Sequence, residues 1–130
     1  MYLLDTNTLI YFFKGMGNVA RVLLSKSPQD LAIPAIVLFE LELGIAKSVD
    51  TSKRRAQLES FVCRINVLPF GENEAQVAAI IRANLEAKGT PIGPYDTLIA
   101  ATAVCANATL VTHNTKEFER VQGIYLEDWY

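Results

Sequence analysis

Met1-Tyr2-Leu3-Leu4-Asp5-Thr6-Asn7-Thr8-Leu9-Ile10 places a carboxylate between a short apolar run and a second apolar run that is compatible with a helix. We expect residues 2–4 to form a buried strand, and a polar residue at 6–8 to cap the helix that follows. Ligands of open parallel sheets bind outside the carboxyl ends of the strands. Asp5 therefore occupies a position where functional carboxylates occur, although a carboxylate after a strand is also an ordinary helix cap.

The rest of the chain alternates extended and helical patterns. Helices are expected over 9–14, 19–25, 35–47, 52–64, 72–88, 96–107 and 114–118, and strands over 31–33, 66–69, 109–112 and 124–126. Strands separated by helices imply a mostly parallel sheet with right-handed crossovers and helices on both faces. The expected fold is a single α/β domain over 1–130, a three-layer α/β/α sandwich with four to five short strands.

Composition narrows the classes of protein. The 130 residues include 51% hydrophobic ones, and the formal net charge is −2, so no whole-surface basic field attracts nucleic acid. Cys63 and Cys105 lie in apolar helical stretches and are expected to be small buried hydrophobic residues. His113 is the single histidine, which excludes a histidine-rich zinc site. No leader peptide or membrane-length apolar run is visible, so a cytoplasmic protein without membrane contact is expected.

Two glutamates interrupt the apolar helix expected over 35–47. Glu40 and Glu42 are about 200° apart around a helix, so they do not share a face. A carboxylate on such an apolar helix needs a partner, a metal or an exit to water. The spacing allows one of them to point into a cleft while the other points to solvent, and the alternative is that both are solvated at helix edges.

Polar residues mark two later positions. Asp96 follows the rigid turn Pro91–Tyr95 and begins an apolar helix, where an acid also simply complements the helix dipole. Thr112 and Asn114 follow the fourth expected strand, the same kind of position as that of Asp5. They are able to bind the water of a metal or a phosphate, or to cap the next helix.

Convergence of these positions would form a cluster of oxygen ligands. Such clusters bind Mg²⁺ or Mn²⁺, which prefer carboxylate and water. A carboxylate-bound divalent ion lowers the pKa of a water, orients it towards a phosphorus and stabilises the leaving oxygen. The sequence therefore predicts a site for phosphodiester hydrolysis at one edge of the sheet.

With these residues in this order, the chain resembles the PIN-domain ribonucleases, and among them the VapC toxins of type II toxin–antitoxin pairs. The resemblance covers nearly the whole length and rests on an ordered set of motifs. These are Leu4–Asn7, Phe39–Leu41 with Gly44, Pro91–Asp96 leading into Ile99–Ala101, Val111–Val121, and Leu126–Trp129.

The resemblance implies roles for individual residues. Asp5, Glu40 and Asp96 match the acidic, metal-binding and catalytic triad of the family. Thr6 and Asn7 match the small polar pair beside the first acid.

The resemblance also implies how the site is closed. Thr112 and Asn114 match the polar residues of that region. Asn114 stands where an Asp often stands, which puts a tightly held second metal in doubt, and Glu117 is a less secure substitute. The implied activity is Mg²⁺- or Mn²⁺-dependent endoribonuclease cleavage of structured RNA such as tRNA or rRNA.

Partners follow from the same resemblance: an RNA substrate, a VapB-type antitoxin and a second copy in a homodimer. Local basic residues would attract the RNA, or would be ordinary solvated charges. The candidates are Lys14, Lys47, Lys53, Arg54, Arg55, Lys88 and Lys116, of which Lys14, Lys47, Arg54 and Arg55 are the preferred set. Two alternatives stay open, a non-catalytic small α/β binding module and another Mg²⁺-dependent phosphohydrolase. The latter is disfavoured because Asn7 interrupts an Asp-x-Asp pattern.

Overall fold

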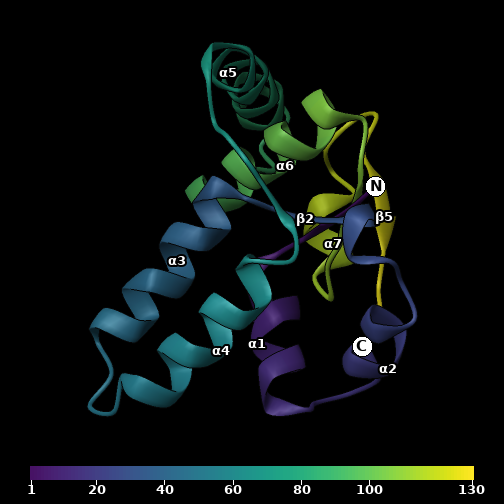
Figure 1. The fold of residues 1–130 in the computed structure, drawn as a ribbon. Coiled ribbons are helices and arrows are strands. Elements are labelled where there is room, and N and C mark those ends of the chain that lie inside the picture. Colours follow the sequence, from purple (N-terminus) through teal and green to yellow (C-terminus); the bar gives the residue numbers. More distant parts are fainter.

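The computed structural model describes residues 1–130 as five short strands and a set of helices that surround them (Figure 1). The strands are β1 (Tyr2–Leu4), β2 (Leu31–Pro34), β3 (Asn66–Leu68), β4 (Thr109–Val111) and β5 (Tyr125–Glu127). The α-helices are α1 (Thr6–Lys14), α2 (Val19–Leu24), α3 (Ala35–Ala46), α4 (Ser52–Val62), α5 (Glu72–Ala87), α6 (Pro94–Ala106) and α7 (Thr115–Phe118), and a 3₁₀ turn η1 spans Pro28–Asp30.

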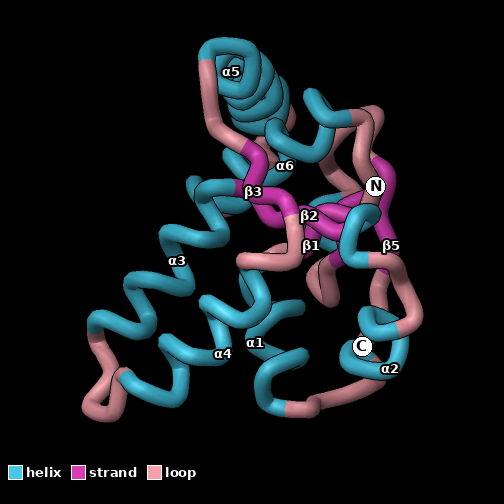
Figure 2. Tube along the Cα trace, viewed as in Figure 1, coloured by secondary structure: helices cyan, strands magenta, loops and turns pink.

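The sheet has the order β3-β2-β1-β4-β5, and every pair of neighbouring strands is parallel. Figure 2 shows the strands together in the middle of the molecule, with helices around them. The chain moves outward from β1 to β2 and β3, and then crosses to β4 on the other side of β1. The carboxyl ends of β1 and β4 therefore form the point where the strand order reverses, which is where open α/β sheets bind ligands. The expected parallel α/β fold is confirmed.

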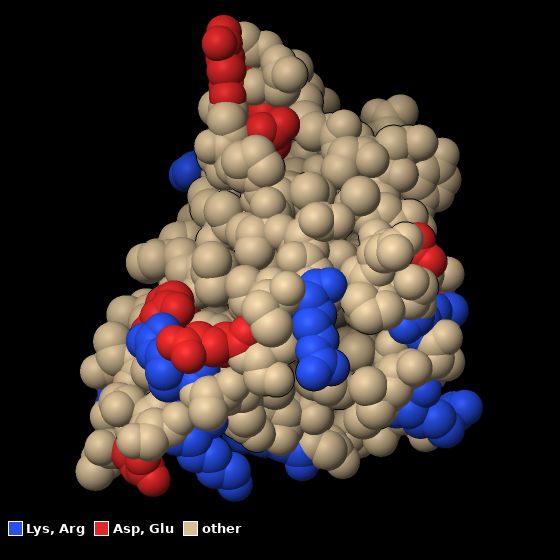
Figure 3. All heavy atoms as spheres, in the orientation of Figure 1, with Lys and Arg blue, Asp and Glu red and all other residues tan.

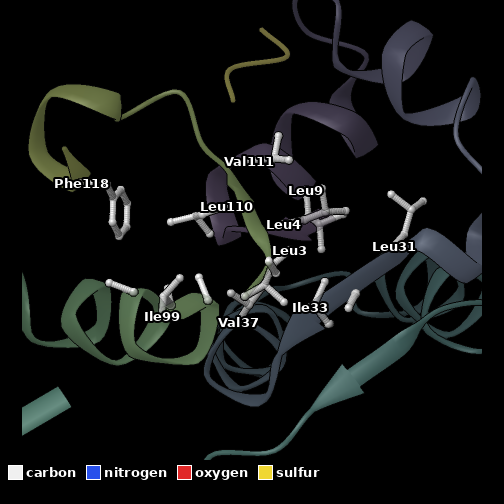
Figure 4. Close-up of a cluster of buried hydrophobic side chains, with 14 of the residues drawn as sticks. Leu3, Leu4, Leu9, Leu31, Ile33, Val37, Ile99, Leu110, Val111 and Phe118 are labelled. Atoms are coloured by element: carbon white, nitrogen blue, oxygen red, sulfur yellow. The ribbon is translucent and has the colours of Figure 1, made fainter. Parts of the chain in front are cut away.

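The central strands are buried on both faces. Leu3 and Leu4 are both fully buried, and their side chains leave the sheet on opposite sides because successive strand residues alternate. In Figure 4, Leu4 lies beside Leu9 of α1, whereas Leu3 lies on the side of Ile99 of α6. An apolar run without polar alternation is the pattern of such doubly covered parallel strands.

Apolar residues around most of the circumference of helix α3 would suggest a buried helix, but α3 is only partly buried. Val37, Leu41 and Ile45 face the core, at the i, i+4, i+8 spacing of a single stripe. Phe39 and Leu43 are 47% and 40% exposed. Much of the helix surface is apolar, but only the stripe of Val37, Leu41 and Ile45 is buried.

The cysteines also differ from expectation, because Cys63 and Cys105 are both exposed. Cys63 follows the last turn of α4, and its Sγ donates to the carbonyl of Ser60 at 3.2 Å. Cys105 lies on the outer face of α6. Apolar neighbours in the sequence predicted burial, but the packing of each helix turned these positions outward. No helix of the structure combines the length and the apolar character that crossing a bilayer requires.

Candidate active site

Asp5 lies at the carboxyl end of β1, next to that of β4. Its backbone N–H donates to the carbonyl of Val111 at 3.2 Å, and its Oδ1 accepts the N–H of Thr8 at 2.8 Å. Asp5 is therefore itself the N-cap of α1. The expectation that a residue at 6–8 would cap this helix is wrong, because α1 begins at Thr6, directly after the strand.

Burial dominates the electrostatics of Asp5, whose residue is 6% exposed. Desolvation raises the pKa of its carboxyl, while hydrogen bonding from Thr112 and Thr8 opposes the rise and the charge of Asp128 adds to it. The Thr8 hydroxyl donates to the carbonyl of Val111 at 3.1 Å, which fixes the start of α1 to the end of β4. Asp5 is thus held rigidly at the point where the strand order reverses.

Glu40 reaches the same region from α3. Its Oε1 accepts a hydrogen bond from the Thr6 hydroxyl at 2.9 Å, which joins the middle of α3 to the start of α1, the helices that follow the neighbouring strands β2 and β1. Glu42 points elsewhere and forms an ion pair of 2.7 Å with Arg55. Glu40 and Glu42 therefore point in different directions from α3, as their helical spacing predicts.

Asp96 is in the first turn of α6, which begins at Pro94 rather than at Asp96 as expected. Proline is favoured in the first turn of a helix, since its missing N–H needs no partner there. Gly93 precedes the helix, and a Cβ at this position would lie 3.3 Å from Asp96 Oδ2. The turn therefore leaves room for the Asp96 carboxylate because residue 93 has no side chain.

Glu117 of α7 binds the loop in front of α6. Its Oε1 accepts the N–H of Gly93 at 3.0 Å, and its Oε2 accepts Asn114 Nδ2 at 2.6 Å. The Asn114 hydrogen bond is the main cause that lowers the pKa of the Glu117 carboxyl, followed by that from Gly93. The backbone N–H of Asn114 in turn donates to the Thr112 hydroxyl at 3.0 Å. Glu117 is therefore a fixed negative charge in this part of the site.

The acids act on one another electrically. The pKa of Asp96 is raised to about 6. Burial is the largest cause, followed by the negative charges of Glu117, Asp5 and Glu40. Repulsion between carboxylates weakens with distance, so this coupling identifies one acidic region built from β1, α3, α6 and α7.

No ion pair joins the site acids to a basic side chain. The ion pairs of the structure involve Glu42, Glu86 and Asp128, and none includes Asp5, Glu40, Asp96 or Glu117. Crowded carboxylate oxygens without a basic partner suit a hard divalent cation. The side chains do not form a group of three or more acidic, histidine or cysteine residues close enough to hold a metal ion as they stand. The donor set fits such an ion, and the spacing requires the carboxylates to draw closer around it.

A basic wall adjoins Glu40. Lys14 from α1 and Lys53 and Arg54 from α4 line a pocket of ≈ 430 Å³ together with Glu40. None of these three cations forms an ion pair. Lys47 lies at an adjoining pocket that Lys53 and Arg54 also line.

Arg55 does not line this pocket and is paired with Glu42 instead.

Two contacts within the site were not anticipated from the sequence. The hydrogen bond of Thr6 links residues 34 positions apart, and no local pattern shows it. The role of Gly93 had a partial signal, since Gly93 stands between Ile92 and Pro94 in the rigid turn.

Comparison with known proteins gives concordant relationships. Residues 2–124 match the family model of the PIN domain. The chain is 39% identical over 128 residues to the tRNA(fMet)-specific endonuclease VapC of Salmonella typhimurium, covering 98% of this chain and 97% of that protein. It is 37% identical over 134 residues to ribonuclease VapC2 of Rickettsia felis, covering 99% and 98%.

Solved structures agree. The crystal structure of VapBC2 from Rickettsia felis bound to a promoter DNA fragment contains a chain that matches with a TM-score of 0.92 and 36% identity, covering 99% of this chain and 98% of that one. The DNA-bound VapBC of Salmonella typhimurium matches with a TM-score of 0.92 and 38% identity, at the same coverage. The motifs, the parallel sheet and these relatives lead to one conclusion: the chain belongs to the PIN-domain family and, within it, to the VapC ribonucleases.

Proposed function

We propose that this protein is an endoribonuclease toxin that hydrolyses phosphodiester bonds in RNA with the help of Mg²⁺ or Mn²⁺. The observation that carries the proposal is geometric: Asp5 lies where the strand order reverses, and the Thr6 hydroxyl beside it donates to Glu40 at 2.9 Å. The raised pKa of Asp96, about 6, agrees with crowding by Glu117, Asp5 and Glu40. Carboxylates that repel one another and lack a basic partner are stabilised by a divalent cation, and such a cation serves phosphodiester hydrolysis.

Asp5, Glu40 and Asp96 would hold the ion through carboxylate oxygens. When bound, the ion would lower the pKa of a water and stabilise the charge that develops on the phosphate. Thr6 orients Glu40 through its hydroxyl. Asn114 and Gly93 fix Glu117, whose negative charge adds to the field around Asp96.

Two further polar residues complete the proposed site. Thr112 is fully buried and hydrogen bonds to Asp5, which stabilises the ionised form of that acid. Asn7 is exposed at the start of α1 and is available to substrate.

Local cations would bind the RNA, since the net charge of −2 gives no general attraction. Figure 3 shows Lys and Arg side chains over α4 and α2, and acidic side chains over α5 and also beside the basic ones in the region of α3 and α4. The unpaired cations Lys14, Lys53 and Arg54 lie beside Glu40 and would contact phosphates next to the cleaved bond. Lys47 would extend this track, while Arg55 is neutralised by Glu42.

The partners are proposed from the relatives. The Salmonella typhimurium relative is named for cleavage of tRNA(fMet), which supports structured RNA such as tRNA or rRNA as the substrate class. VapBC complexes of relatives support a VapB-type antitoxin. The homodimer is proposed from the resemblance to the toxin family. An apolar groove of ≈ 460 Å³ whose lining includes Phe12, Phe13 and Phe61 offers a surface for an antitoxin segment.

Incubation with total RNA tests the activity. We expect site-limited cleavage with Mg²⁺ or Mn²⁺, none with EDTA, and none with Asp5→Asn. Asparagine caps helices as well as aspartate, so Asp5→Asn should keep the fold. Cleavage by Asp5→Asn within about threefold of the wild type would contradict the site assignment.

The same assay separates the alternatives. RNA that stays intact under every condition, with the folded wild type, would favour a non-catalytic binding module. Metal-dependent release of phosphate from a small phosphomonoester, with RNA left intact, would favour another phosphohydrolase. Cleavage that persists in EDTA would contradict the role of the metal, but the protein would still be a nuclease.

A further inference from the structure

Two exposed aromatic residues directly precede proposed site acids in the sequence, on two different helices. Phe39 precedes Glu40 on α3, and Tyr95 precedes Asp96 in the first turn of α6. Their ring centroids are 5.7 Å apart, with an interplanar angle of 70°. Residues far apart in the sequence therefore form one aromatic pair next to the acidic region.

Both rings are much more exposed to solvent than the aromatic ring of Phe118 in the core. Phe39 is 47% exposed and Tyr95 is 45% exposed, whereas Phe118 is 1% exposed in the core. Aromatic rings contribute most to stability when they are buried, so an exposed pair at a proposed active site indicates a ligand rather than packing.

We propose that Phe39 and Tyr95 stack an unpaired nucleobase next to the cleaved bond. This inference rests on the proposed ribonuclease function and extends it to how the substrate is chosen. Recognition of single-stranded RNA uses bases that are splayed out and stacked on aromatic side chains. The edge-to-face arrangement of the pair leaves ring surface open for such a base.

The surroundings favour a nucleobase over a second copy of the chain. Each ring adjoins an acid on its own helix, so a nucleotide whose phosphate lies at the acids has its base within reach of the rings. The basic wall of Lys14, Lys53 and Arg54, which lines a pocket with Glu40, suits phosphates. An apolar protein surface over the pair would instead bury Glu40 and Asp96 further without a basic partner, which is costly.

The test uses an RNA oligonucleotide that contains the cut site mapped with total RNA, and copies with one abasic nucleotide at each flanking position. We expect Tyr95→Ala to lower kcat/KM roughly tenfold on the intact oligonucleotide, the loss of one stacked base. Tyr95→Phe should stay near the wild type because the ring is kept. On the RNA that lacks the stacked base, wild type and Tyr95→Ala should cleave equally. Phe39→Ala should behave like Tyr95→Ala, and Phe39→Tyr, which keeps a ring, should behave like Tyr95→Phe.

Tyr125→Ala is the matched control. Tyr125 is a 60% exposed tyrosine on β5, and its strand pairs it with Thr109 at the end of the sheet opposite the acids. A base-stacking role also predicts quenching of 2-aminopurine placed at the same position, on binding to Asp5→Asn, and loss of that quenching in Asp5→Asn with Tyr95→Ala. This readout does not depend on cleavage.

The outcomes separate the two proposals. If the wild type cleaves RNA and Tyr95→Ala cleaves equally well, the stacking inference fails and the ribonuclease function stands. A tenfold loss that persists on every abasic RNA would also overturn it. A change of oligomeric state in Tyr95→Ala, measured by light scattering, would assign the pair to contact between copies instead. Failure of the wild type to cleave any RNA would overturn the function itself.

Discussion

The hydroxyl of Thr6 donates a hydrogen bond of 2.9 Å to Oε1 of Glu40, which connects the first turn of α1 to the middle of α3. Each residue lies on the helix that follows one of two neighbouring strands, β1 and β2. The hydrogen bond sets the direction of a carboxylate on a long, flexible side chain. Thr6 is therefore a positioning residue for the proposed site.

Thr6→Val should lower the rate of RNA cleavage while leaving the fold intact, because it removes the donor and keeps the shape. A hydrogen bond to a charged group is worth about 1.5–3 kcal/mol, so we expect a loss of about tenfold or more in kcat. Thr6→Ser keeps the hydroxyl and should restore most of the rate. Equal rates for the Val and Ser variants would show that Glu40 needs no such support.

Asp96→Asn should stabilise the protein at neutral pH. The pKa of Asp96 is raised from 3.8 to about 6, so the folded state binds its proton more tightly than the unfolded state does. Stability is therefore highest below pH 3.8 with respect to this group, and falls as the pH rises through about 6. Because Asp96 is half-buried and solvent screens its charge, we expect a gain of about 1 kcal/mol at pH 7.5.

Urea unfolding of the wild type and Asp96→Asn at several pH values measures this effect. The difference in free energy of unfolding should be present at pH 7.5 and shrink toward pH 4. A constant difference across this range would mean that the substitution acts through packing and not through charge.

Glu117→Gln should lower the pKa of Asp96 toward its ordinary value. The Glu117 charge follows burial as the second cause of the raised pKa, and the amide removes that charge while its oxygen still accepts the Gly93 N–H. Carbon-13 NMR titration of the aspartate carboxyl groups follows the shift directly. Glu119→Gln, an exposed acid two positions away, is the control and should leave the Asp96 titration unchanged.

Mg²⁺ or Mn²⁺ should raise the Tm of the wild type. An ion that binds only the folded state stabilises it by about 2.7 kcal/mol at a concentration one hundred times its Kd. The gain should disappear in Asp96→Asn, which loses a proposed ligand and a repulsive charge together. NaCl at matched ionic strength controls for general screening. An equal rise of Tm in both proteins would place the ion elsewhere.

Lys14→Ala and Arg54→Ala should each weaken RNA binding and flatten its dependence on salt. A cation that neutralises one phosphate contributes about 0.7 to the slope of log K against log salt for single strands. Arg55→Ala is the control, because Arg55 is paired with Glu42 and does not line the pocket. RNA binding is measured by filter binding, with each substitution made in the Asp5→Asn protein so that the RNA is not cleaved during the measurement. Larger losses in Arg55→Ala than in Arg54→Ala would contradict the proposed track.

The periodicity of the sequence was sufficient to predict the helices and strands and the parallel sheet. Leu3 and Leu4 are the clearest case, because two adjacent apolar residues in a short strand indicate a sheet covered on both faces. Register and strand order were out of reach, since they depend on packing between segments far apart in the chain. The exposure of Cys63 and Cys105 shows the same limit, because the sequence pattern does not say which face of a helix finds a neighbour.

The candidate site was predictable as a set of residues but not as a geometry. The position of Asp5 after a strand was readable, whereas its role as N-cap depended on where α1 begins. The bonds of Glu40 to Thr6 and of Glu117 to Gly93 join distant parts of the chain. Catalytic roles for these residues stay a prediction that the variants above address.

The strand order has a consequence for synthesis. β1 is made first but pairs with β4, and the backbone N–H of Asp5 finds its carbonyl partner at Val111. The proposed site also draws on Asp96 and Glu117, so an emerging chain cannot assemble it until nearly all of the protein has left the ribosome. A nascent or prematurely terminated chain that ends before Glu117 therefore lacks part of the proposed site, so any cleavage activity should require a chain that is almost complete.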